Sequence, residues 1–401
     1  MPDIWTFHSA GQLVFGCGAS ARIGQLVARL GVRRVMIVTD QHLIDAGIAD
    51  SIAVPLAAAG IDAPCFTGGV PEPTLEAAER SIAYARDLRP EAVLGLGGGS
   101  NMDLAKITAT VMAHGGKPRD YFGDDCLSGP VLPLVCVPTT AGTGSEVSAS
   151  CVLTDREAQV KVGVLSNYLR PRLAIVDPLL TLSCPAKVTA DSGIDALTHA
   201  IEAFTAVDNE HFPLAPNEKT VYQGRHPLAD ALAEKAIRLI GANLERAVKE
   251  PSNEDAREAM SLGATLAGLA FSNVGVALVH ALEYPLGGLT HCSHGAGNGL
   301  FLPYVMRFNL PQREQALARV AAFLGVDTRG QSDHQAAEAG IRRVEELKQA
   351  TGIPARLREL GVTREQLPQL AEKTLAIKRI LRVNPRVVTL ADLMSILESA
   401  L

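Results

Sequence analysis

Two distant stretches of the sequence combine one carboxylate with several imidazoles, in a pattern that could hold a single divalent ion. Asp195 and His199 are four positions apart in the stretch DALTHAIEAF. If that stretch is a helix, the two side chains lie on one face. His280 and His294 come from a later stretch, VHALEYPLGGLTHCSH. One carboxylate and three imidazoles suit Fe²⁺ or Zn²⁺ and leave room for a substrate oxygen.

Each of these residues also has an ordinary structural interpretation. An Asp and a His at this spacing are common on exposed helices. His280 differs because it ends an uncharged apolar stretch, and a buried imidazole needs a polar partner. His291 is a second candidate close to His294, and Cys292 is a softer ligand whose small side chain also suits loop packing.

Two further segments follow predicted strands and could bind phosphate. The first is GLGGGSNMDLAK at 95–106, where glycines let the backbone approach a diphosphate and a helix N-terminus supplies free N–H groups. The second is PTTAGTGSE at 138–146, whose hydroxyls suit ribose or phosphate oxygens. A tight strand–helix turn has a similar sequence. If the two strands are neighbours, both segments could face one ligand at the carboxyl edge of a sheet.

Asp40 ends the first strong predicted strand, RRVMIVTD. A carboxylate at this place can accept hydrogen bonds from an adenosine ribose and repels a 2′-phosphate, so it favours NAD over NADP. Asp is also a good N-cap for the helix that follows. Both interpretations stay open.

The apolar runs predict an α/β first half and an all-helical second half. Strands that alternate with helices imply parallel pairing. The predicted strands are 33–40, 63–70, 91–97, 133–140 and 172–178, and the helices between them include 75–88 and 102–114. Beyond residue 185 the apolar positions recur with a helical period. The helices predicted there are 186–204, 227–248, 253–283, 312–324, 333–351, 364–378 and 390–400.

We therefore expect an α/β domain at 1–185 and an all-helical domain at 186–401, with a surface loop at 207–224 between two helices. The N-terminal stretch at 4–16 could form an edge hairpin. An exposed strand edge invites pairing with a second subunit, so a homodimer is expected.

Composition and charge exclude several classes of protein. The 401 residues are 20% charged and 47% hydrophobic, which is an ordinary globular composition. A net charge of −6 gives no basic region for nucleic acid or anionic lipid. Seven cysteines without a CxxC pair predict reduced thiols, and the start of the chain shows no signal-peptide pattern, so we expect a cytoplasmic protein. The uncharged stretch 259–282 is rich enough in Gly, Ser, Asn and His to favour a buried helix over a membrane span.

In this order, the motifs resemble those of the iron-containing (group III) alcohol dehydrogenases. They are GGGSNMDLAK, PTTAGTGSEVS, DALTHAIEA and the segment from His280 to His294, and the resemblance extends over essentially the whole chain. It implies a dehydroquinate synthase-like fold with an N-terminal α/β dinucleotide-binding domain, an all-α metal-binding domain and an active site in the cleft between them. It also implies NAD as cofactor, a divalent ion with Fe²⁺ favoured over Zn²⁺, and a small alcohol or hydroxyacid as substrate.

The resemblance also assigns roles to residues. The metal ligands would be Asp195, His199, His280 and His294. The diphosphate would bind at Gly97, Gly98, Gly99 and Ser100, and the cofactor would be lined by Thr139, Thr140, Thr143 and Lys161. Three single positions match as well: Asp40 for NAD preference, Asp103 for a local structural or cofactor role, and Phe271 for the nicotinamide and substrate pocket.

One position departs from the family pattern. Many members have a second His in an HxxxHPLG pattern, whereas this chain has HALEYPLG, with Tyr284 at that place. The imidazole that is suggested to carry a proton is therefore absent. A phenol can pass a proton, although its ordinary pKa is far higher. Either Tyr284, with its pKa tuned by its environment, or a water molecule would carry the proton. Alternatively, Tyr284 only packs against its neighbours.

The implied reaction moves a hydride from the carbinol carbon of a metal-bound alkoxide to the nicotinamide. Three features resemble the hydroxyacid–oxoacid transhydrogenase branch more closely than the simple ethanol or propanediol enzymes: Tyr284, the loop at 207–224 and YQGRHPLAD at 222–230. The resemblance to that branch implies hydride transfer between a hydroxyacid and an oxoacid through NAD that stays bound. In that branch Arg225 and His226 could meet a substrate carboxylate, although a solvent-facing helix cap is the simpler interpretation. A dehydroquinate synthase-like lyase and a non-catalytic NAD or metal sensor are the alternative classes.

Overall fold

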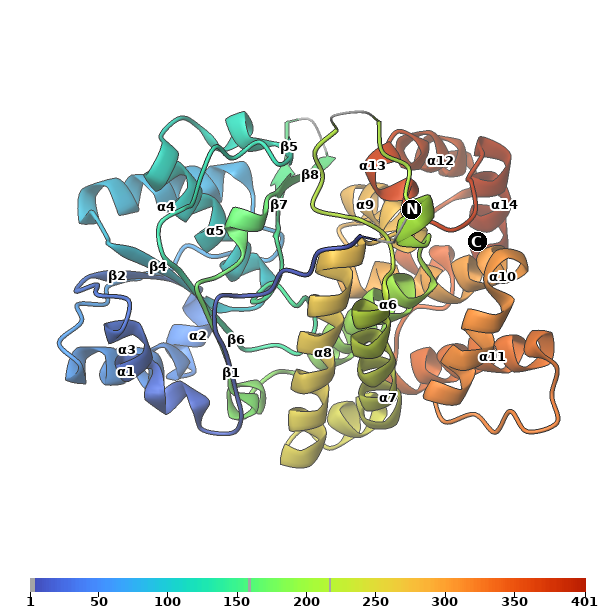
Figure 1. Ribbon diagram of the computed structural model, residues 1–401, viewed down its shortest axis with the longest axis horizontal. Helices are drawn as coiled ribbons and strands as arrows, with labels where there is room; N and C mark the ends of the chain where they lie inside the picture. Colours follow the sequence, from blue (N-terminus) through green and yellow to red (C-terminus); the bar gives the residue numbers. More distant parts are fainter. Residues whose placement is uncertain (1–3, 158–159, 216–217) are drawn as a thin grey trace. The chain divides into compact units, whose positions relative to one another are not determined.

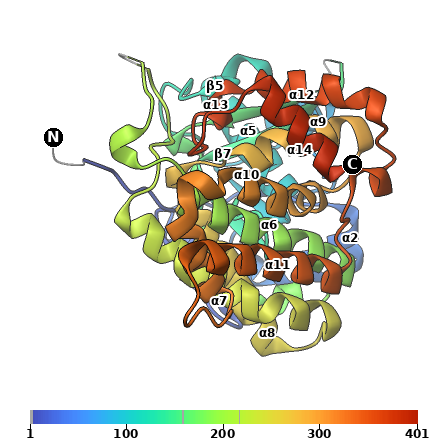
Figure 2. The ribbon, with the colours of Figure 1, turned by 90° about the vertical axis from the view of Figure 1, so that its right-hand side faces the viewer.

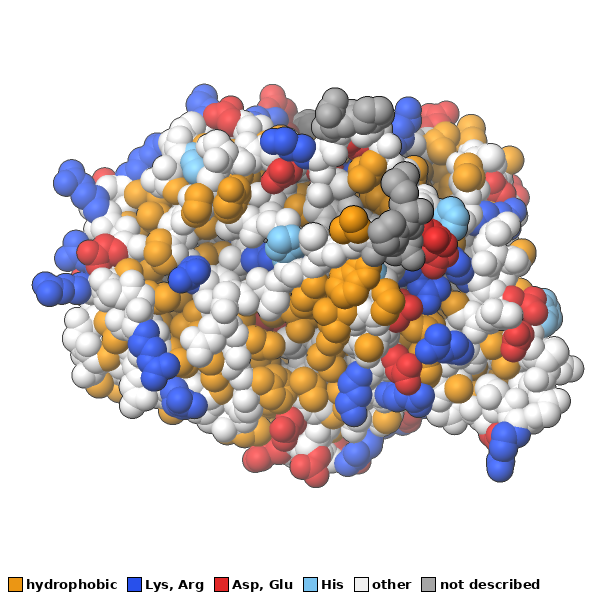
Figure 3. All heavy atoms as spheres, viewed as in Figure 1, with side chains coloured by type: hydrophobic (Ala, Val, Ile, Leu, Met, Phe, Trp, Pro, Cys, Tyr) orange, Lys and Arg blue, Asp and Glu red, His pale blue; other side chains and the backbone are white. Residues whose placement is uncertain are grey.

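The computed structural model describes residues 4–157, 160–215 and 218–401 (Figure 1). Two compact units can be distinguished by their internal contacts. The first, called here the sheet unit, comprises His8–Cys184 with Lys219–Val221. The second, the helical unit, comprises the chain up to Phe7 and nearly everything after Pro185. Lys and Arg side chains are intermixed with Asp and Glu side chains on the face that Figure 3 shows.

The sheet unit is built on six strands in the order β1-β9-β6-β4-β2-β3, and all neighbours are parallel. Val35 and Ile37 belong to one buried apolar cluster, whereas Met36 and Val38 belong to another, because successive side chains of a strand point to opposite faces. Both faces are therefore covered, as expected for a parallel sheet. The strands are β1 (Leu13–Phe15), β2 (Val35–Val38), β3 (Cys65–Phe66), β4 (Ala92–Gly97), β6 (Leu134–Pro138) and β9 (Leu173–Val176).

Helices from two parts of the sequence cover the two faces. The cluster that contains Ile37 includes residues of α1 and α3, and the cluster that contains Met36 includes residues of α4 and α5. The α-helices are α1 (Ile23–Ala28), α2 (Gln41–Asp45), α3 (Ile48–Ala58), α4 (Leu75–Leu88) and α5 (Gly99–His114). Short 3₁₀ helices are η1 (Ala19–Arg22), η2 (Pro118–Tyr121), η3 (Asn167–Leu169) and η4 (Pro178–Thr181).

A second, three-stranded sheet was not predicted from the sequence. It consists of β5 (Gly123–Asp124), β8 (Val160–Leu165) and β7 (Ser150–Asp155) in that order, with β7 antiparallel to β8. Only alternate residues of β7 are buried. Such a half-buried strand leaves no continuous apolar run in the sequence, so the pattern that revealed the six parallel strands was missing here.

The hairpin expected at 4–16 does not form. β1 is a single short strand at the edge of the six-stranded sheet, where it pairs with β9. Before it, the backbone of Thr6 hydrogen bonds in both directions with the Gln223 side chain, and Trp5 stacks on the His226 ring. Trp5 and Thr6 are thus held by side chains of the helical unit and do not form a second strand.

The helical unit is a set of packed helices. α6, α7 and α8 pack against one another, and α10 packs against both α6 and α11 (Figures 1 and 2). The predicted helices at 333–351 and 390–400 match α11 and α14. The long helices are α6 (Ala186–Thr205), α7 (Pro227–Lys249), α8 (Glu254–Val274), α9 (Leu278–Thr290), α10 (His294–Phe323) and α11 (Asp333–Thr351). The shorter ones are η5 (Asn209–His211), η6 (Leu357–Leu360), η7 (Arg364–Gln366), α12 (Leu367–Leu375), α13 (Lys378–Leu381) and α14 (Leu390–Ala400).

Two predicted helices in this unit were wrong in extent. The helix expected at 312–324 starts much earlier, at His294, and has a kink at Arg313, two residues after Pro311. Glycine and proline have low helix propensity, but Ser293 caps the start of this helix and tertiary packing overrides the weak propensity. The loop expected at 207–224 contains η5, and residues 216–217 of it lie outside the described part of the chain.

The single helix expected at 253–283 is instead two helices, α8 and α9. α8 ends at Val274, and Gly275 then adopts a φ of +116°, which an L side chain rarely adopts. Among the described residues, no individual helix combines the length and hydropathy needed to cross a bilayer; α8 and α9 meet that criterion only as a pair bent by 102° at this break.

Candidate metal centre and phosphate-binding loops

One carboxylate and three imidazoles from α6, α9 and α10 converge inside the helical unit. The Oδ1 atom of Asp195 is 4.0 Å from Nε2 of His199, and 3.9 Å from the Nε2 atoms of both His280 and His294. Ligand atoms of Asp195, His280 and His294 all lie within 4.8 Å of one another. Ligands about 2.1 Å from a tetrahedral ion are about 3.4 Å apart, so small inward movements would let these atoms hold one divalent ion.

Asp195 keeps a negative charge although it is buried. Burial by itself would raise the pKa of its carboxyl group. The charge that the facing imidazoles carry when they are protonated and a hydrogen bond from Asn298 Nδ2 outweigh that effect, and the pKa of Asp195 lies below its ordinary value. An anionic oxygen at this point suits a divalent cation.

The tautomers of two imidazoles can be read from their hydrogen bonds. Nδ1 of His280 is 2.6 Å from a carboxylate oxygen of Glu202, and Nδ1 of His294 is 2.5 Å from one of Glu283. A carboxylate can only accept, so both Nδ1 atoms donate a proton. Each Nε2 atom faces the Asn298 amide, whose Nδ2 lies 3.1 Å from Nε2 of His280 and 3.2 Å from Nε2 of His294. An amide N–H can only donate, so both Nε2 atoms accept and carry a lone pair, which is the state that a metal ligand requires.

The break between α8 and α9 places His280. The backbone N–H groups of Ala277 and Val279, at the start of α9, donate to the Glu202 carboxylate over 2.9 and 2.7 Å. Glu202 projects from α6, so one side chain caps α9 and fixes the position of the imidazole one turn into it. A continuous helix would have its N–H groups occupied and could not be held in this way.

A glycine places His294. A Cβ atom at Gly295 would lie 1.9 Å from the carbonyl oxygen of Asp191 on α6, so only glycine lets α10 begin this close. Ser293, the N-cap of α10, also donates to the Asp191 carboxylate over 2.5 Å. Together these contacts bring the first residue of α10 beside Asp195.

Two aromatic candidates from the sequence lie next to the imidazoles. The Phe271 ring stacks on His199 with 4.1 Å between ring centroids. The Tyr284 ring is 6.2 Å from that of His294 and is 9% exposed. His291, the alternative ligand, instead ends α9 with a φ of +55° and is exposed.

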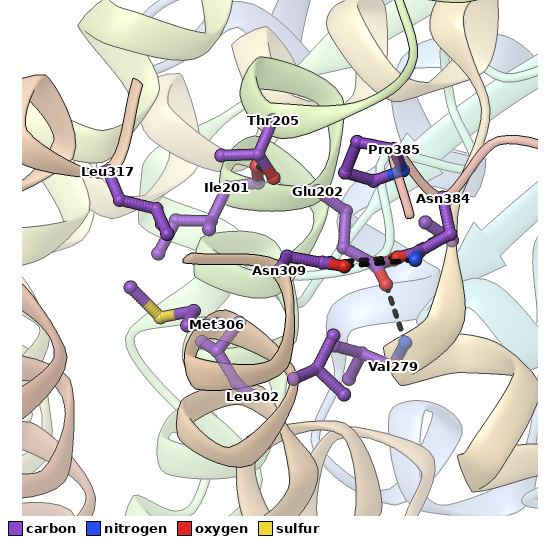
Figure 4. A pocket seen from close by; sticks show the side chains of 12 residues that line it. Ile201, Glu202, Thr205, Val279, Leu302, Met306, Asn309, Leu317, Asn384 and Pro385 are labelled. Atoms are coloured by element: carbon purple, nitrogen blue, oxygen red, sulfur yellow. Dashed lines mark hydrogen bonds between the residues drawn. The ribbon is translucent and has the colours of Figure 1, made fainter. Parts of the chain in front are cut away.

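The pocket behind Glu202 is too small for a substrate. Figure 4 shows its carboxylate beside a pair of buried amides, Asn309 and Asn384, which hydrogen bond to each other over 2.8 and 2.9 Å. The cavity between them and the apolar residues around measures about 10 Å³. Such a volume is at the lower limit for one water molecule, so this region supports Glu202 and binds no substrate.

In the sheet unit, the two phosphate-type segments lie at the carboxyl ends of β4 and β6, and these two strands are neighbours. The loops contact each other through small residues. A Cβ on Gly99 would lie 2.7 Å from the Thr143 side chain, and the backbone N–H of Thr139 donates to Gly97 over 3.0 Å. Gly98 lies near Thr140, and α5 begins with Gly99 and Ser100 without a side-chain cap at its start. The N-terminus of α5 is therefore available to an anion.

Asp40 combines a capping role with a link to the first glycine loop. One carboxylate oxygen accepts from the Leu43 N–H at the start of α2, and the other accepts from Asn101 Nδ2 over 2.7 Å. Asn101 also donates to the carbonyl of Leu96 at the end of β4. Asp40 is thus the N-cap of α2, as the structural interpretation predicted. It also lies next to the first glycine loop, where the interpretation as a ribose-binding residue would place it.

Asp103 and Lys161 have protein partners. The Asp103 carboxylate accepts from Ser145 Oγ over 2.7 Å and from the Val152 N–H over 2.9 Å, so it joins α5 to the second loop and to β7. Lys161 forms an ion pair with Glu72 over 2.9 Å. These contacts give Asp103 a structural role, and its role toward the cofactor stays a prediction.

Sequence reasoning missed Lys106, which is fully buried one turn after Asp103. Its Nζ atom donates to Ser145 Oγ, to both oxygens of Ser148 and to the carbonyl of Ser150, at 2.7 to 3.3 Å. The Lys106 side chain therefore holds the second loop in position through these hydrogen bonds. A lysine in an otherwise apolar helix face was the signal that could have identified it.

Arg225 and His226 are engaged in structure. Arg225 forms ion pairs with Asp208 and Asp230. His226 caps α7 with Nδ1, as expected, but it is not solvent-facing: Trp5 stacks on its ring at 4.5 Å, and only 3% of the residue is exposed. Since the Arg225 charge is balanced by two carboxylates, this region gives no support to recognition of a substrate carboxylate.

Comparisons with known proteins cover almost the whole chain. Residues 10–178 match the family described as iron-containing alcohol dehydrogenase, and residues 189–401 match the C-terminal part of the Fe-containing alcohol dehydrogenase family. Long-chain-alcohol dehydrogenase 1 of Geobacillus thermodenitrificans (strain NG80-2) is 39% identical over 96% of this chain and 94% of its own length. NAD-dependent methanol dehydrogenase of Bacillus methanolicus is 35% identical over 97% of each chain. A solved structure of 1,3-propanediol oxidoreductase superposes with a TM-score of 0.93 at 35% identity, covering 99% of this chain and 100% of that one.

The role of Lys106 can be tested with Lys106→Met. The substitution leaves the half-buried Asp103 carboxylate without the Lys106 charge and removes the hydrogen bonds that hold the second loop. We expect the free energy of unfolding to fall by about 3 kcal/mol, with weaker binding of NAD in a fluorescence titration. Lys249→Met, at a lysine on the surface of α7, is the control and should change both by little. If Lys106→Met and Lys249→Met had the same free energy of unfolding and the same affinity for NAD, the role given to Lys106 would be contradicted.

Proposed function

The chain belongs to the iron-containing alcohol dehydrogenase family, and from this we propose that it transfers a hydride between an alcohol and NAD at a divalent metal centre. The ligands we propose are Asp195, His199, His280 and His294, with Fe²⁺ as the ion and Zn²⁺ as the alternative. The observation that carries this proposal is the convergence of one buried carboxylate and three imidazole Nε2 atoms from three helices. A relative that is named as NAD-dependent supports the choice of cofactor.

NAD is proposed to bind to the α/β part of the chain, residues 1–185, and the metal ion to the helical part, residues 186–401. The diphosphate would bind where α5 begins, at Gly97, Gly98, Gly99 and Ser100. Thr139, Thr140, Thr143 and Lys161 would line the cofactor. Asp40 would meet the adenosine ribose, and its charge would repel the 2′-phosphate of NADP. The uncapped start of α5 supports this assignment, because its N–H groups can bind phosphate oxygens.

The residues of the chain bind and orient the reacting groups. When bound, the divalent ion supplies a Lewis acid for the alcohol oxygen, and NAD supplies the hydride acceptor. The ligand atoms of Asp195 and of the three histidines face one point. The Phe271 ring stacks on His199, holds it in position and provides an apolar surface beside it. Burial of Asp195, which is 2% exposed, limits water around the charge and strengthens its electrostatic interactions.

We also propose a cytoplasmic homodimer. β1 lies at the edge of the six-stranded sheet, where it could pair with a second copy of the chain. The seven cysteines without a CxxC pair support a reducing compartment. The oligomeric state can be measured by sedimentation.

Tyr284 is proposed to carry the proton, since it takes the place of the second His of the family pattern and lies beside His294. Tyr284→Phe removes only the hydroxyl group. We expect kcat to fall about 100-fold or more, with metal content unchanged by mass spectrometry. Unchanged kcat would assign proton transfer to water and leave Tyr284 a packing role.

His199→Ala tests the proposed function as a whole. Loss of one imidazole should remove the bound metal and the alcohol-dependent formation of NADH together, while NAD binding stays measurable because the glycine loop is untouched. His334→Ala, at an exposed histidine on α11, should keep the metal and the activity. Metals are measured by mass spectrometry and NADH by absorbance over a panel of alcohols and hydroxyacids. Normal turnover of His199→Ala without bound metal would contradict the mechanism. Wild-type protein that forms no net NADH would favour either the lyase class or a transhydrogenase that retains its NAD.

A further inference from the structure

We propose that Glu283 and Glu202 are positioning residues: each fixes the tautomer and ring direction of one imidazole, and Glu283 sets how tightly the centre holds a divalent ion. This inference rests on the proposed function, since it concerns the same centre. Neither glutamate was identified from the sequence, and no comparison assigns a role to either.

Glu283 is fully buried on α9, directly before Tyr284, and it accepts a hydrogen bond from His294 Nδ1 over 2.5 Å. The neighbouring helix makes room for it: a Cβ on Gly297 would lie 2.8 Å from the Glu283 side chain. An ionised carboxylate without a charged or hydrogen-bonding partner would cost several kcal/mol at such a place. The burial of Glu283 is therefore compatible with folding because His294 faces it.

Glu202 has the same relation to His280, with an added structural task. Its carboxylate accepts from His280 Nδ1 over 2.6 Å and also from the N–H groups of Ala277 and Val279. Figure 4 shows the side chain between the start of α9 and the Asn309 amide. Removing Glu202 would thus loosen α9 as well as the imidazole, whereas Glu283 offers a cleaner test.

The other two proposed ligands are oriented in different ways. Asn298 Nδ2 donates to Asp195 Oδ1 over 2.7 Å, and His199 lies between the rings of Phe271 and His280 at centroid distances of 4.1 and 4.8 Å. Rotation of any of the four ligand side chains would therefore break a hydrogen bond or a ring stack. Such preorganisation lowers the entropy lost when an ion binds.

The charges around the site also favour the binding of a divalent cation. Asp195, Glu202 and Glu283 bring three carboxylates to a cluster whose histidines are neutral when their Nε2 atoms act as ligands. This excess of negative charge attracts a divalent cation. Outer partners of metal-ligating histidines typically change metal affinity 10- to 100-fold when they are lost.

The first test is a Co²⁺ titration, followed by the absorption of the ion in competition with a chelator. Glu283→Gln keeps the shape and one acceptor but removes the charge, and we expect it to bind Co²⁺ about 10-fold more weakly than wild type. Glu283→Ala should be about 100-fold weaker, and Glu283→Asp should recover part of the loss. Glu210→Gln, at an exposed acid of the same unit, is the matched control and should bind like wild type.

The second test reads the tautomers of the wild-type protein directly, so it does not depend on a variant that folds. In ¹⁵N-histidine NMR of the Zn²⁺-loaded protein, His280 and His294 should be protonated at Nδ1, with slowly exchanging protons. In Glu283→Gln only the His294 signal should shift, while NAD binding stays unchanged.

Three outcomes are informative. Co²⁺ affinity of Glu283→Gln and Glu283→Ala within twofold of wild type would overturn the inference and leave the metal centre intact. A wild-type His294 that is protonated at Nε2 would overturn it as well. Wild-type protein that binds neither Co²⁺ nor Zn²⁺ would instead overturn the proposed metal centre, and with it this inference.

Discussion

The structure of the helical unit depends on the balance of one buried negative charge, that of Asp195. A carboxylate taken out of water is strongly destabilising unless donors or cations face it. Asp195 is 2% exposed and accepts a hydrogen bond from Asn298 Nδ2, and a divalent ion held together with the imidazole nitrogens from α6, α9 and α10 would balance its charge. The break after α8, the glycine at 295 and the Glu202 carboxylate all serve to bring those groups to it. An alcohol oxygen at such a point would meet an ion whose ligands are fixed in position, of which Asp195, His199 and His280 are buried and His294 is 32% exposed at its side chain.

In the sheet unit, a buried positive charge has a corresponding structural role. Lys106 is a buried cation beneath the second loop, and its Nζ atom is 3.9 Å from the Asp103 carboxylate. Four oxygens of the loop and of β7 satisfy its hydrogen bonds. A loop that is fixed in position by these hydrogen bonds can present its backbone to a ligand. In both units a buried charge positions the groups that would bind the cofactor or the ion.

The sequence predicted most of what depends on local pattern. Parallel strands appeared as apolar runs, and the alternation of strands and helices indicated that they pair in a parallel sheet. The spacing of Asp195 and His199 within one helix also needed only local geometry. What it could not predict depends on contacts between distant residues. Glu202 and His280 are 78 positions apart in the chain, and nothing near either residue marks the pair. The half-buried strands β7 and β8, the break at Gly275 and the N-terminal segment held by Gln223 were missed for the same reason, since each is determined by packing partners elsewhere.

The most direct test of the central claim is a crystal structure with diffraction data collected on both sides of the absorption edge of the bound metal. The account predicts one anomalous peak, with one oxygen of Asp195 and the Nε2 atoms of His199, His280 and His294 at about 2.0 to 2.2 Å from it. A peak elsewhere in the chain, or an ion at this place that is bound by fewer than three of these side chains, would contradict it.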